Sequence, residues 1–212
     1  MTRLNTGGMG TVAPNPCYTP AIAAECMEKI LLPTVAAMQA EGCPFKGCLY
    51  FGLMLTPDGP KVIEYNCRFG DPETQVVLPL LESDLLTVMQ ACTNGTLDKT
   101  EVKFSDGAAA CVVLASGGYP VAYEKGKEIT GLENGQVPGA ADVTVYHAGT
   151  AIKDGKLVTN GGRVLGVTAT AATLPEALKK AYAAADCIHF DKLHRRSDIG
   201  ARALAAMKAQ EG

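Results

Sequence analysis

One run of twelve residues, Val62 to Glu73, constrains this chain more than any other segment. It reads as a β-strand that ends with Glu64 and Asn66, continues through Arg68 and reaches Asp71-Pro72-Glu73. Side chains two positions apart on a strand point to the same face, so Glu64 and Asn66 project together. Both offer hard oxygen ligands suited to Mg²⁺, and Arg68 adds a fork that can hold phosphate oxygens. The run therefore indicates a metal and phosphate site at a strand end.

Each part of this run also has a simpler interpretation. A Glu-x-Asn pair occurs by chance on many solvated strand faces, and only its place beside Arg68 and a helix start favours a metal site. Asp71-Pro72-Glu73 is typical of a helix start, with a cap, a proline and an acid in the first turn. Asp71 can equally bind a substrate hydroxyl or amine, and the two roles do not exclude each other.

Composition limits the class of protein. The chain has 212 residues, enough for one or two domains, and it is 47% hydrophobic and 19% charged, with a net charge of −3. This balance excludes a strongly basic nucleic-acid surface, no apolar run is long enough to cross a bilayer, and the N-terminus lacks a signal-peptide segment. We therefore expect neither nucleic-acid nor membrane partners.

Eight cysteines are present, but none forms a Cys-x-x-Cys pair and only three histidines accompany them. Several of them lie in apolar runs such as the one around Cys111. Buried, reduced thiols of a cytoplasmic protein explain them better than zinc.

The first half is expected to be mixed helix and hairpin. Apolar spacing predicts a helix over 21–31, bent or restarted by Pro33 and continuing to Ala40. The next elements are a hairpin and two helices, namely strands 45–56 and 61–66 joined by a turn over 56–60, then helices from 71 to 81 and from 83 to about 95.

The second half changes character. We expect four strands, at 108–115, 143–149, 156–159 and 163–170, with a hairpin turn at 153–156. A capping box predicts the start of a helix over 173–188, and a short helix follows Asp198. We place a domain boundary in the polar stretch 96–107. The expected fold is α+β, with domains 1–95 and 108–212.

Three further segments carry weaker signals. Thr6-Gly7-Gly8-Met9-Gly10 can bring backbone N–H groups close to an anion, although a plain turn explains it too and it lacks the P-loop pattern. Arg195 and Arg196 precede a helix, a placement that suits a phosphate monoester, but adjacent arginines are often a solvated face. Gly161 to Gly166 is interpreted as a turn entering a strand. No Ser-His-Asp or Cys-His nucleophile is indicated.

Several motifs together resemble one family. Arg68-Phe69-Gly70-Asp71-Pro72-Glu73-Thr74-Gln75 is similar to the signature of the phosphoribosylamine–glycine ligase (glycinamide ribonucleotide synthetase) family of ATP-grasp enzymes. Supporting segments resemble that family in the same order, namely Asn5–Gly10, Gly47–Met54, Gly162–Leu165 and Arg195–Gly200. The resemblance implies the larger lobe of an ATP-grasp domain followed by a small, mostly β C-terminal domain with helices.

The same resemblance implies a reaction of purine biosynthesis. Glycine is joined to 5-phosphoribosylamine at the expense of ATP, through a glycyl phosphate, with ADP and phosphate as products. Glu64 and Asn66 look like ligands of the Mg²⁺ or Mn²⁺ that bridges the ATP phosphates, and Arg68 looks like a phosphate stabiliser. Asp71 and the Thr6–Gly10 loop are similar to segments on the substrate side. Arg195 and Arg196 resemble a basic pair that meets the ribose 5-phosphate.

The chain also departs from the family pattern. Many ATP-grasp enzymes have a third acidic metal ligand, but no acid lies between Glu41 and Asp58. The resemblance covers only the C-terminal half of the family, without the lobe that clamps adenine, and Met1 to Leu4 do not look like it. We expect weak ATP affinity, little turnover without the N-terminal half, and self-association through bare apolar faces. The alternatives are an inactive paralogue acting as a metal, ribose-phosphate or interaction module, and another grasp enzyme such as a carboxylase, against which the Arg68–Gln75 signature argues.

Overall fold

The computed structural model describes residues 6–211, so Asn5 of the glycine loop and the N-terminal Met1 to Leu4 lie outside the described residues. The chain forms two compact units that are interleaved in sequence. We call them the sheet unit and the hairpin unit; the first holds the described parts of Met1–Pro14, Asp71–Leu80 and Ser105–Gly212, the second Asn15–Gly70 and Leu81–Phe104. The domain bounds expected from the sequence, 1–95 and 108–212, stay a prediction.

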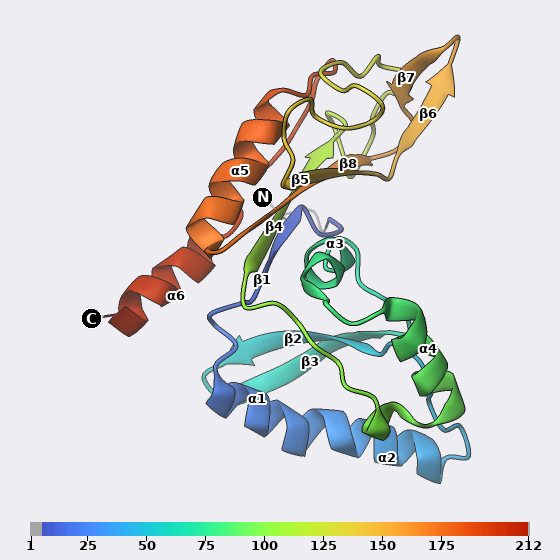
Figure 1. The fold of residues 1–212 in the computed structure, drawn as a ribbon, viewed down its shortest axis with the longest axis vertical. Helices are drawn as coiled ribbons and strands as arrows, with labels where there is room; N and C mark the ends of the chain where they lie inside the picture. The colour runs from blue at the N-terminus through green and yellow to red at the C-terminus, as the bar shows by residue number, and fades with distance from the viewer. Residues whose placement is uncertain (1–5, 212) are drawn as a thin grey trace. The chain divides into compact units, whose positions relative to one another are not determined.

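The sheet unit is built on a four-stranded antiparallel sheet in the order β1-β4-β8-β5 (Figure 1). Its strands are β1 (Gly10–Ala13), β4 (Ala108–Ala115), β5 (Val143–His147) and β8 (Arg163–Ala171). The register pairs Gly10 with Val112 and Val112 in turn with Val167. The N-terminal strand therefore lies beside a strand about a hundred residues later in the chain.

Every residue of β4 is buried. Its even positions, from Ala108 to Leu114, join the core under helix α5 (Leu174–Asp186). Its odd positions Ala109 and Cys111 pack with α3 (Thr74–Val77) and the 3₁₀ turn η2 (Leu78–Leu80). Because side chains alternate along a strand, an uninterrupted apolar run such as this one is what a strand covered on both faces requires.

Outside the four-stranded sheet, the sheet unit contains a two-stranded hairpin and helices. The hairpin joins β6 (Thr150–Lys153) to β7 (Lys156–Thr159) through the turn that the sequence predicted, with Asp154 and Gly155 both at positive φ. Helix α6 spans Ala201–Glu211. Thr173 stands at the N-cap of α5 but makes no side-chain cap hydrogen bond, so the helix is confirmed and the capping box is wrong.

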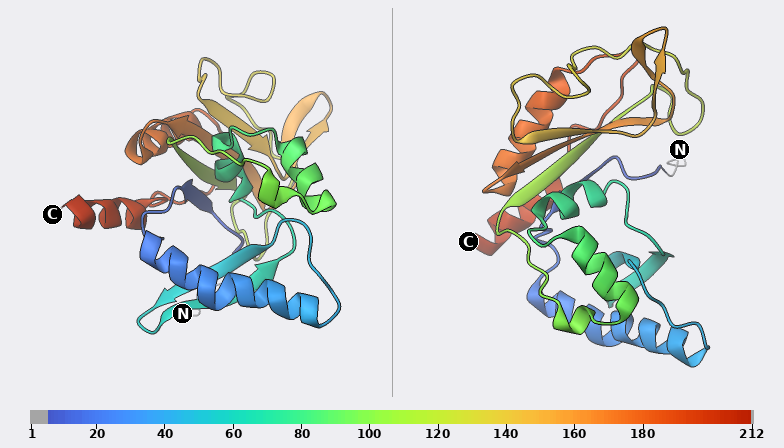
Figure 2. Two further views of the ribbon diagram at one scale, coloured as in Figure 1. Left: turned by 60° about the horizontal axis from the view of Figure 1, so that its bottom comes forward. Right: turned by 45° about the vertical axis from the view of Figure 1, so that its right-hand side comes forward.

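The hairpin unit contains the antiparallel pair β2 (Tyr50–Thr56) and β3 (Gly59–Asn66). One helical rod runs alongside it in both views of Figure 2. The rod is α1 (Pro20–Cys26), a π-helical segment η1 (Met27–Leu31) and α2 (Leu32–Ala40). The hydrogen bond from Leu32 N–H to Met27 O widens the helix next to Pro33, which lacks an N–H. The helix thus continues through Pro33 to Ala40, and the bend or restart expected there takes the form of this π-helical segment.

Helix α4 (Leu85–Asn94) and the turn η3 (Leu97–Lys99) complete the hairpin unit. Asp84 caps α4, since its side chain accepts a hydrogen bond from Thr87 N–H, and Gly95 ends the helix with φ 71°. The predicted bounds of this helix are confirmed. In the part of the chain that the structure describes, no helix is long and apolar enough to cross a membrane.

Other element bounds differ from the expectation. The strand expected from Phe45 begins at Tyr50, because Gly47 has φ 136° and interrupts an extended run. The helix expected from Asp71 begins at Thr74. Strand β1 and strand β6 were not predicted; each has only four residues and is ordered by its pairing partner.

We predict that Val112→Ala lowers the free energy of unfolding by about 2 kcal/mol, since it removes buried methyl groups and leaves a cavity under α5. Val112 is fully buried, whereas Val121 of the same unit is 69% exposed. The matched change Val121→Ala should alter stability by less than about 0.5 kcal/mol in the same urea titration. Equal effects of the two substitutions would contradict the assigned core.

Candidate functional site

A row of three polar side chains lies at the end of β3 in the hairpin unit. Asn66 Nδ2 donates to Glu64 Oε1 at 3.0 Å, and Arg68 NH2 donates to Asn66 Oδ1 at 3.3 Å. Arg68 NH1 donates to Phe69 O at 2.8 Å. The structure thus brings together the three residues that the sequence placed on one strand face.

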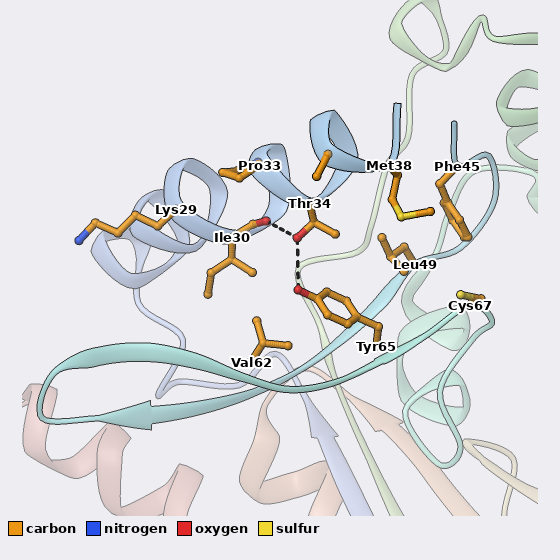
Figure 3. Close-up of a pocket in the computed structure, with 11 residues that line it drawn as sticks. Lys29, Ile30, Pro33, Thr34, Met38, Phe45, Leu49, Val62, Tyr65 and Cys67 are labelled. Atoms are coloured by element: carbon orange, nitrogen blue, oxygen red, sulfur yellow. Dashed lines mark hydrogen bonds between the residues drawn. The ribbon is translucent and has the colours of Figure 1, made fainter. Parts of the chain in front are cut away.

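A β-bulge decides which way this row faces. The register steps from Gly52–Glu64 to Leu53–Val62, which leaves Ile63 without an opposite residue. Because one residue is added, Val62 and Tyr65 both point toward the α1–α2 rod (Figure 3). Glu64 and Asn66 alternate with Tyr65 and so face away from the rod.

The strand opposite Glu64 leaves room for its side chain. Gly52 is paired with Glu64, and a Cβ added at Gly52 would lie 3.0 Å from Glu64 Cγ. A larger residue there would require the Glu64 side chain to shift by a few tenths of an ångström. Glycine at this position therefore allows the observed close approach of the two strands' residues.

The donor chemistry of the row fits a hard divalent cation. It offers a carboxylate and an amide oxygen, the ligand types that Mg²⁺ takes alongside phosphate oxygens and water. Among the described residues, no group of three or more His, Cys, Asp or Glu side chains could hold a metal ion. A cation here would depend on two protein ligands and on oxygens from elsewhere.

A groove of the hairpin unit lies on the other side of the hairpin. It has a volume of about 560 Å³ and is lined mainly by apolar residues such as Ile30, Met38 and Leu49 (Figure 3). Its polar contacts include a 3.4 Å interaction between Thr34 Oγ1 and the Tyr65 hydroxyl and a 2.7 Å hydrogen bond from Thr34 Oγ1 to Ile30 O. Ligand sites combine apolar walls with converging polar groups, so this groove is a poorer candidate than the polar row.

The sheet unit gathers a second set of predicted residues around Arg163. NH2 of Arg163 donates to Asp71 Oδ2 at 2.8 Å, and NH1 donates to Asp71 O at 2.8 Å and to Gly8 O at 3.2 Å. Asp71 Oδ1 accepts a 2.8 Å hydrogen bond from Gln75 Nε2. One guanidinium therefore ties the glycine loop to the family signature.

Asp71 is not the cap of α3, so that interpretation is wrong. The N-cap residue is Glu73, without a side-chain cap hydrogen bond, and the Asp71 carboxylate is bound by side chains instead. The reason is tertiary: Arg163 lies 92 positions later in the chain and competes for the carboxylate.

The glycine loop is shaped by close approaches. A Cβ at Gly8 would lie 2.4 Å from Pro72 Cδ, and one at Gly10 would lie 2.6 Å from Ile199 Cδ1. The N–H of Gly7 donates to the Tyr119 hydroxyl at 3.0 Å. Met9 accepts a hydrogen bond from the N–H of Val113, and Thr6 is exposed.

The predicted arginine pair is engaged with neighbouring side chains. Arg196 forms a two-point ion pair with Asp198, with distances of 2.7 and 2.6 Å, and its hydrogen bond lowers the pKa of that carboxyl. Arg195 pairs with Asp186 and lies 5.6 Å from the centre of the Tyr182 ring. Both guanidiniums thus have acidic partners, Asp186 for Arg195 and Asp198 for Arg196.

Sequence reasoning missed the part played by Arg163 and Tyr119. Arg163 has a signal, because Gly162-Arg163-Val164-Leu165 is among the segments that resemble the family, but local chemistry favours a turn entering a strand over 161–166. Tyr119 follows two glycines and carried no signal. Gln75 was noted only as the end of the signature.

Comparisons with known proteins define the class of fold first. The ATP-grasp (A) domain of phosphoribosylglycinamide synthetase matches residues 2–74, and the C domain of the same synthetase matches residues 109–202. The biotin carboxylase domain of Hydrogenobacter thermophilus 2-oxoglutarate carboxylase has a similar fold, with a TM-score of 0.60 over 88% of this chain and 40% of that one. At 15% identity, that likeness concerns the fold alone. The chain is α+β, with part of an ATP-grasp domain followed by a C domain.

More similar relatives identify the family. Phosphoribosylamine–glycine ligase of Synechocystis sp. is 50% identical over 203 residues, which are 95% of this chain and 48% of that protein. The trifunctional purine biosynthetic protein adenosine-3 of Gallus gallus is 51% identical over 98% of this chain and 20% of its own length. The crystal structure of the Thermotoga maritima ligase superposes with a TM-score of 0.79 at 41% identity, covering 92% of this chain and 47% of that one.

The chain belongs to the phosphoribosylglycinamide synthetase family, and it spans about half the length of the curated ligases that it matches. The predicted resemblance and fold class are thereby confirmed. A carboxylase, the other grasp enzyme considered, is related at the level of the fold only.

The buried thiol of Cys111 gives the stability of the sheet unit a pH dependence that can be measured. Burial raises the pKa of Cys111 from 9.0 to about 11. The folded state therefore favours the protonated thiol, whose stabilising effect is complete below pH 9 and is lost as the pH rises through 11. We predict a loss on the order of 2 kcal/mol in the free energy of unfolding over this range.

The measurement is a series of urea titrations between pH 8 and about 11. Cys111→Ala should flatten this part of the pH dependence, whereas Cys187→Ala, a change at an exposed cysteine of the same unit, should leave it as in the wild type. A Cys111→Ala protein with an unchanged slope would refute the assignment.

Proposed function

We propose that this chain contributes the metal, phosphate and substrate side of a phosphoribosylamine–glycine ligase. The reaction joins glycine to 5-phosphoribosylamine with ATP: the glycine carboxylate takes the γ-phosphoryl group, and the amine then displaces phosphate from the glycyl phosphate. The observation that carries the proposal is the Glu64–Asn66–Arg68 row in a chain about half of whose residues are identical to those of named ligases.

Each residue of the row has a role that follows from its chemistry. Glu64 and Asn66 would hold Mg²⁺ or Mn²⁺, which neutralises charge on the ATP phosphates when bound. Arg68 would bind phosphate oxygens through its planar fork. Phosphoryl transfer needs positioning and charge neutralisation more than covalent help from the protein, so three well-oriented polar groups are an adequate contribution.

The sheet unit would hold the substrates. Asp71 and the Thr6–Gly10 loop would line the substrate side, with the Asp71 carboxylate able to accept a hydrogen bond from an amine. Arg195 and Arg196 would meet the ribose 5-phosphate only by exchanging their acidic partners Asp186 and Asp198 for it. Among the proposed roles, phosphate binding by Arg195 and Arg196 requires the largest change in side-chain contacts.

The first experiment tests the activity itself. ADP formation is measured with glycine, phosphoribosylamine and ATP, using this chain alone and with the remaining half of a family member added. We expect little turnover alone and clear turnover in the mixture. No turnover in either case would refute the ligase function for this polypeptide and favour the alternative, an inactive metal-binding, ribose-phosphate-binding or interaction module.

We predict that Glu64→Gln lowers kcat/KM of the active mixture by about a hundredfold, because a neutral amide is a poorer cation ligand than a carboxylate. Raising the Mg²⁺ concentration should recover part of the loss. The control is Glu41→Gln, the same change at an exposed residue of the hairpin unit, which should keep wild-type activity. A fully active Glu64→Gln protein would disprove the metal assignment.

The rod of the hairpin unit supports the expected self-association and the need for a partner half. Met27, Leu32, Val35 and Met38 are 38–60% exposed, and no residue of α2 is buried. A helix that is apolar on more than one side normally has a covering partner. A cytoplasmic location of the assembled protein remains a prediction from the reduced cysteines.

We predict that the double change Leu32→Gln and Val35→Gln weakens self-association by about tenfold or more, since it removes exposed apolar area. Sedimentation equilibrium measures the dissociation constant. Ile152→Gln, at a 71% exposed residue of the sheet unit, is the control and should leave the constant unchanged. A wild-type chain that stays monomeric at high concentration would contradict the proposal.

A further inference from the structure

We propose that Arg163 is a positioning residue of the substrate side: it holds Asp71 and the glycine loop in one arrangement and thereby sets the affinity for glycine. This inference rests on the proposed function. Arg163 itself has no assigned role in the reaction, and it acts through Asp71 and Gly8.

The guanidinium binds two separate segments at once. It donates to Asp71 Oδ2, Asp71 O and Gly8 O at 2.8, 2.8 and 3.2 Å. Gly8 is 155 residues from Arg163 in sequence, and Asp71 is 92. Arginine presents several donors in a rigid plane, whereas lysine offers one ammonium point, so lysine cannot reproduce this set.

The backbone of Arg163 is held in place by strand pairing in the sheet. It is the first residue of β8 and pairs with Ala115 at the end of the buried strand β4. Its side chain is 24% exposed. A largely shielded guanidinium that starts from a rigid strand loses little freedom when it binds, which suits a positioning role.

The glycine loop also packs closely against Arg163. A Cβ at Gly7 would lie 3.1 Å from Arg163 Cζ, so only glycine allows the loop to rest on the guanidinium without displacement. The Gly7 N–H donates to the Tyr119 hydroxyl, and a Cβ at Gly162 would lie 2.2 Å from Tyr119 Cδ2. Tyr119 therefore packs beside the residue preceding Arg163 and forms a second anchor.

Hydrogen bonds to both oxygens fix the orientation of the Asp71 carboxylate. Gln75 binds Oδ1 and Arg163 binds Oδ2, which prevents rotation of the group. Each carboxylate oxygen keeps a second lone pair that can accept from a protonated amine. Glycine carries such an amine, so loss of Arg163 should weaken glycine binding through misorientation of Asp71 while the charge of Asp71 is retained.

The first arm of the test needs no activity. Amide hydrogen exchange is measured on the full chain for residues 6–10 and 71–75 in the wild type, Arg163→Gln and Arg163→Lys. We expect exchange in both segments to rise about tenfold in both variants, because the segments open locally. Lys180→Gln, which breaks the exposed ion pair with Asp142 in the same unit, should leave these segments unchanged. Unchanged exchange in Arg163→Gln would overturn the proposal.

The second arm uses the active mixture. We expect Arg163→Gln and Arg163→Lys each to raise KM for glycine about tenfold, with KM for ATP within about twofold of wild type. A role confined to fold stability or to charge would instead change both KM values together, or be rescued by lysine, and either result overturns the proposal. If the wild-type mixture has no turnover, the proposed function fails and hydrogen exchange alone decides whether Arg163 holds the two segments.

Discussion

The burial of β4 on both faces is the constraint on which the sheet unit depends. One face of the strand packs under α5, and the other packs against α3 and η2. Its two edges pair with β1 and β8. Each of these neighbours carries one part of the proposed substrate side: β1 follows the glycine loop, α3 follows Asp71, and β8 begins at Arg163. A stable central strand thus brings three distant segments into hydrogen-bonding reach.

Small residues make this convergence feasible. Ala109 and Cys111 face the signature helix, and the Cys111 sulfur lies where a Cβ at Gly166 would come within 3.2 Å. Larger side chains at these places would hold the backbones apart, and packed cores tolerate little extra volume. The raised pKa of Cys111 is a consequence of the same burial. Packing and the electrostatics of the site therefore have a common origin.

The hairpin unit achieves its site by a different route. Its buried hydrophobic residues among the described ones are Cys26 and Ala91, and many large apolar side chains are exposed. The polar row depends on local geometry: strand alternation, one bulge at Ile63 and a glycine opposite Glu64. The row can therefore form in a unit that exposes much of its apolar surface. This contrast supports the proposal that the chain needs a partner half for activity.

The sequence by itself determined what depends on near neighbours. Period-two spacing put Glu64 with Asn66, the apolar run gave β4 its bounds, Asp84 and Gly95 set the ends of α4, and the Arg68–Gln75 signature identified the family. The tertiary structure alone decided the partner of Asp71, the use of Arg163 and Tyr119, and the existence of β1. These features depend on contacts between segments about a hundred residues apart. Local spacing carries no information on which distant donor will bind a given carboxylate in the folded chain. The Asp71 cap was a sound local expectation that a stronger, non-local ion pair replaced.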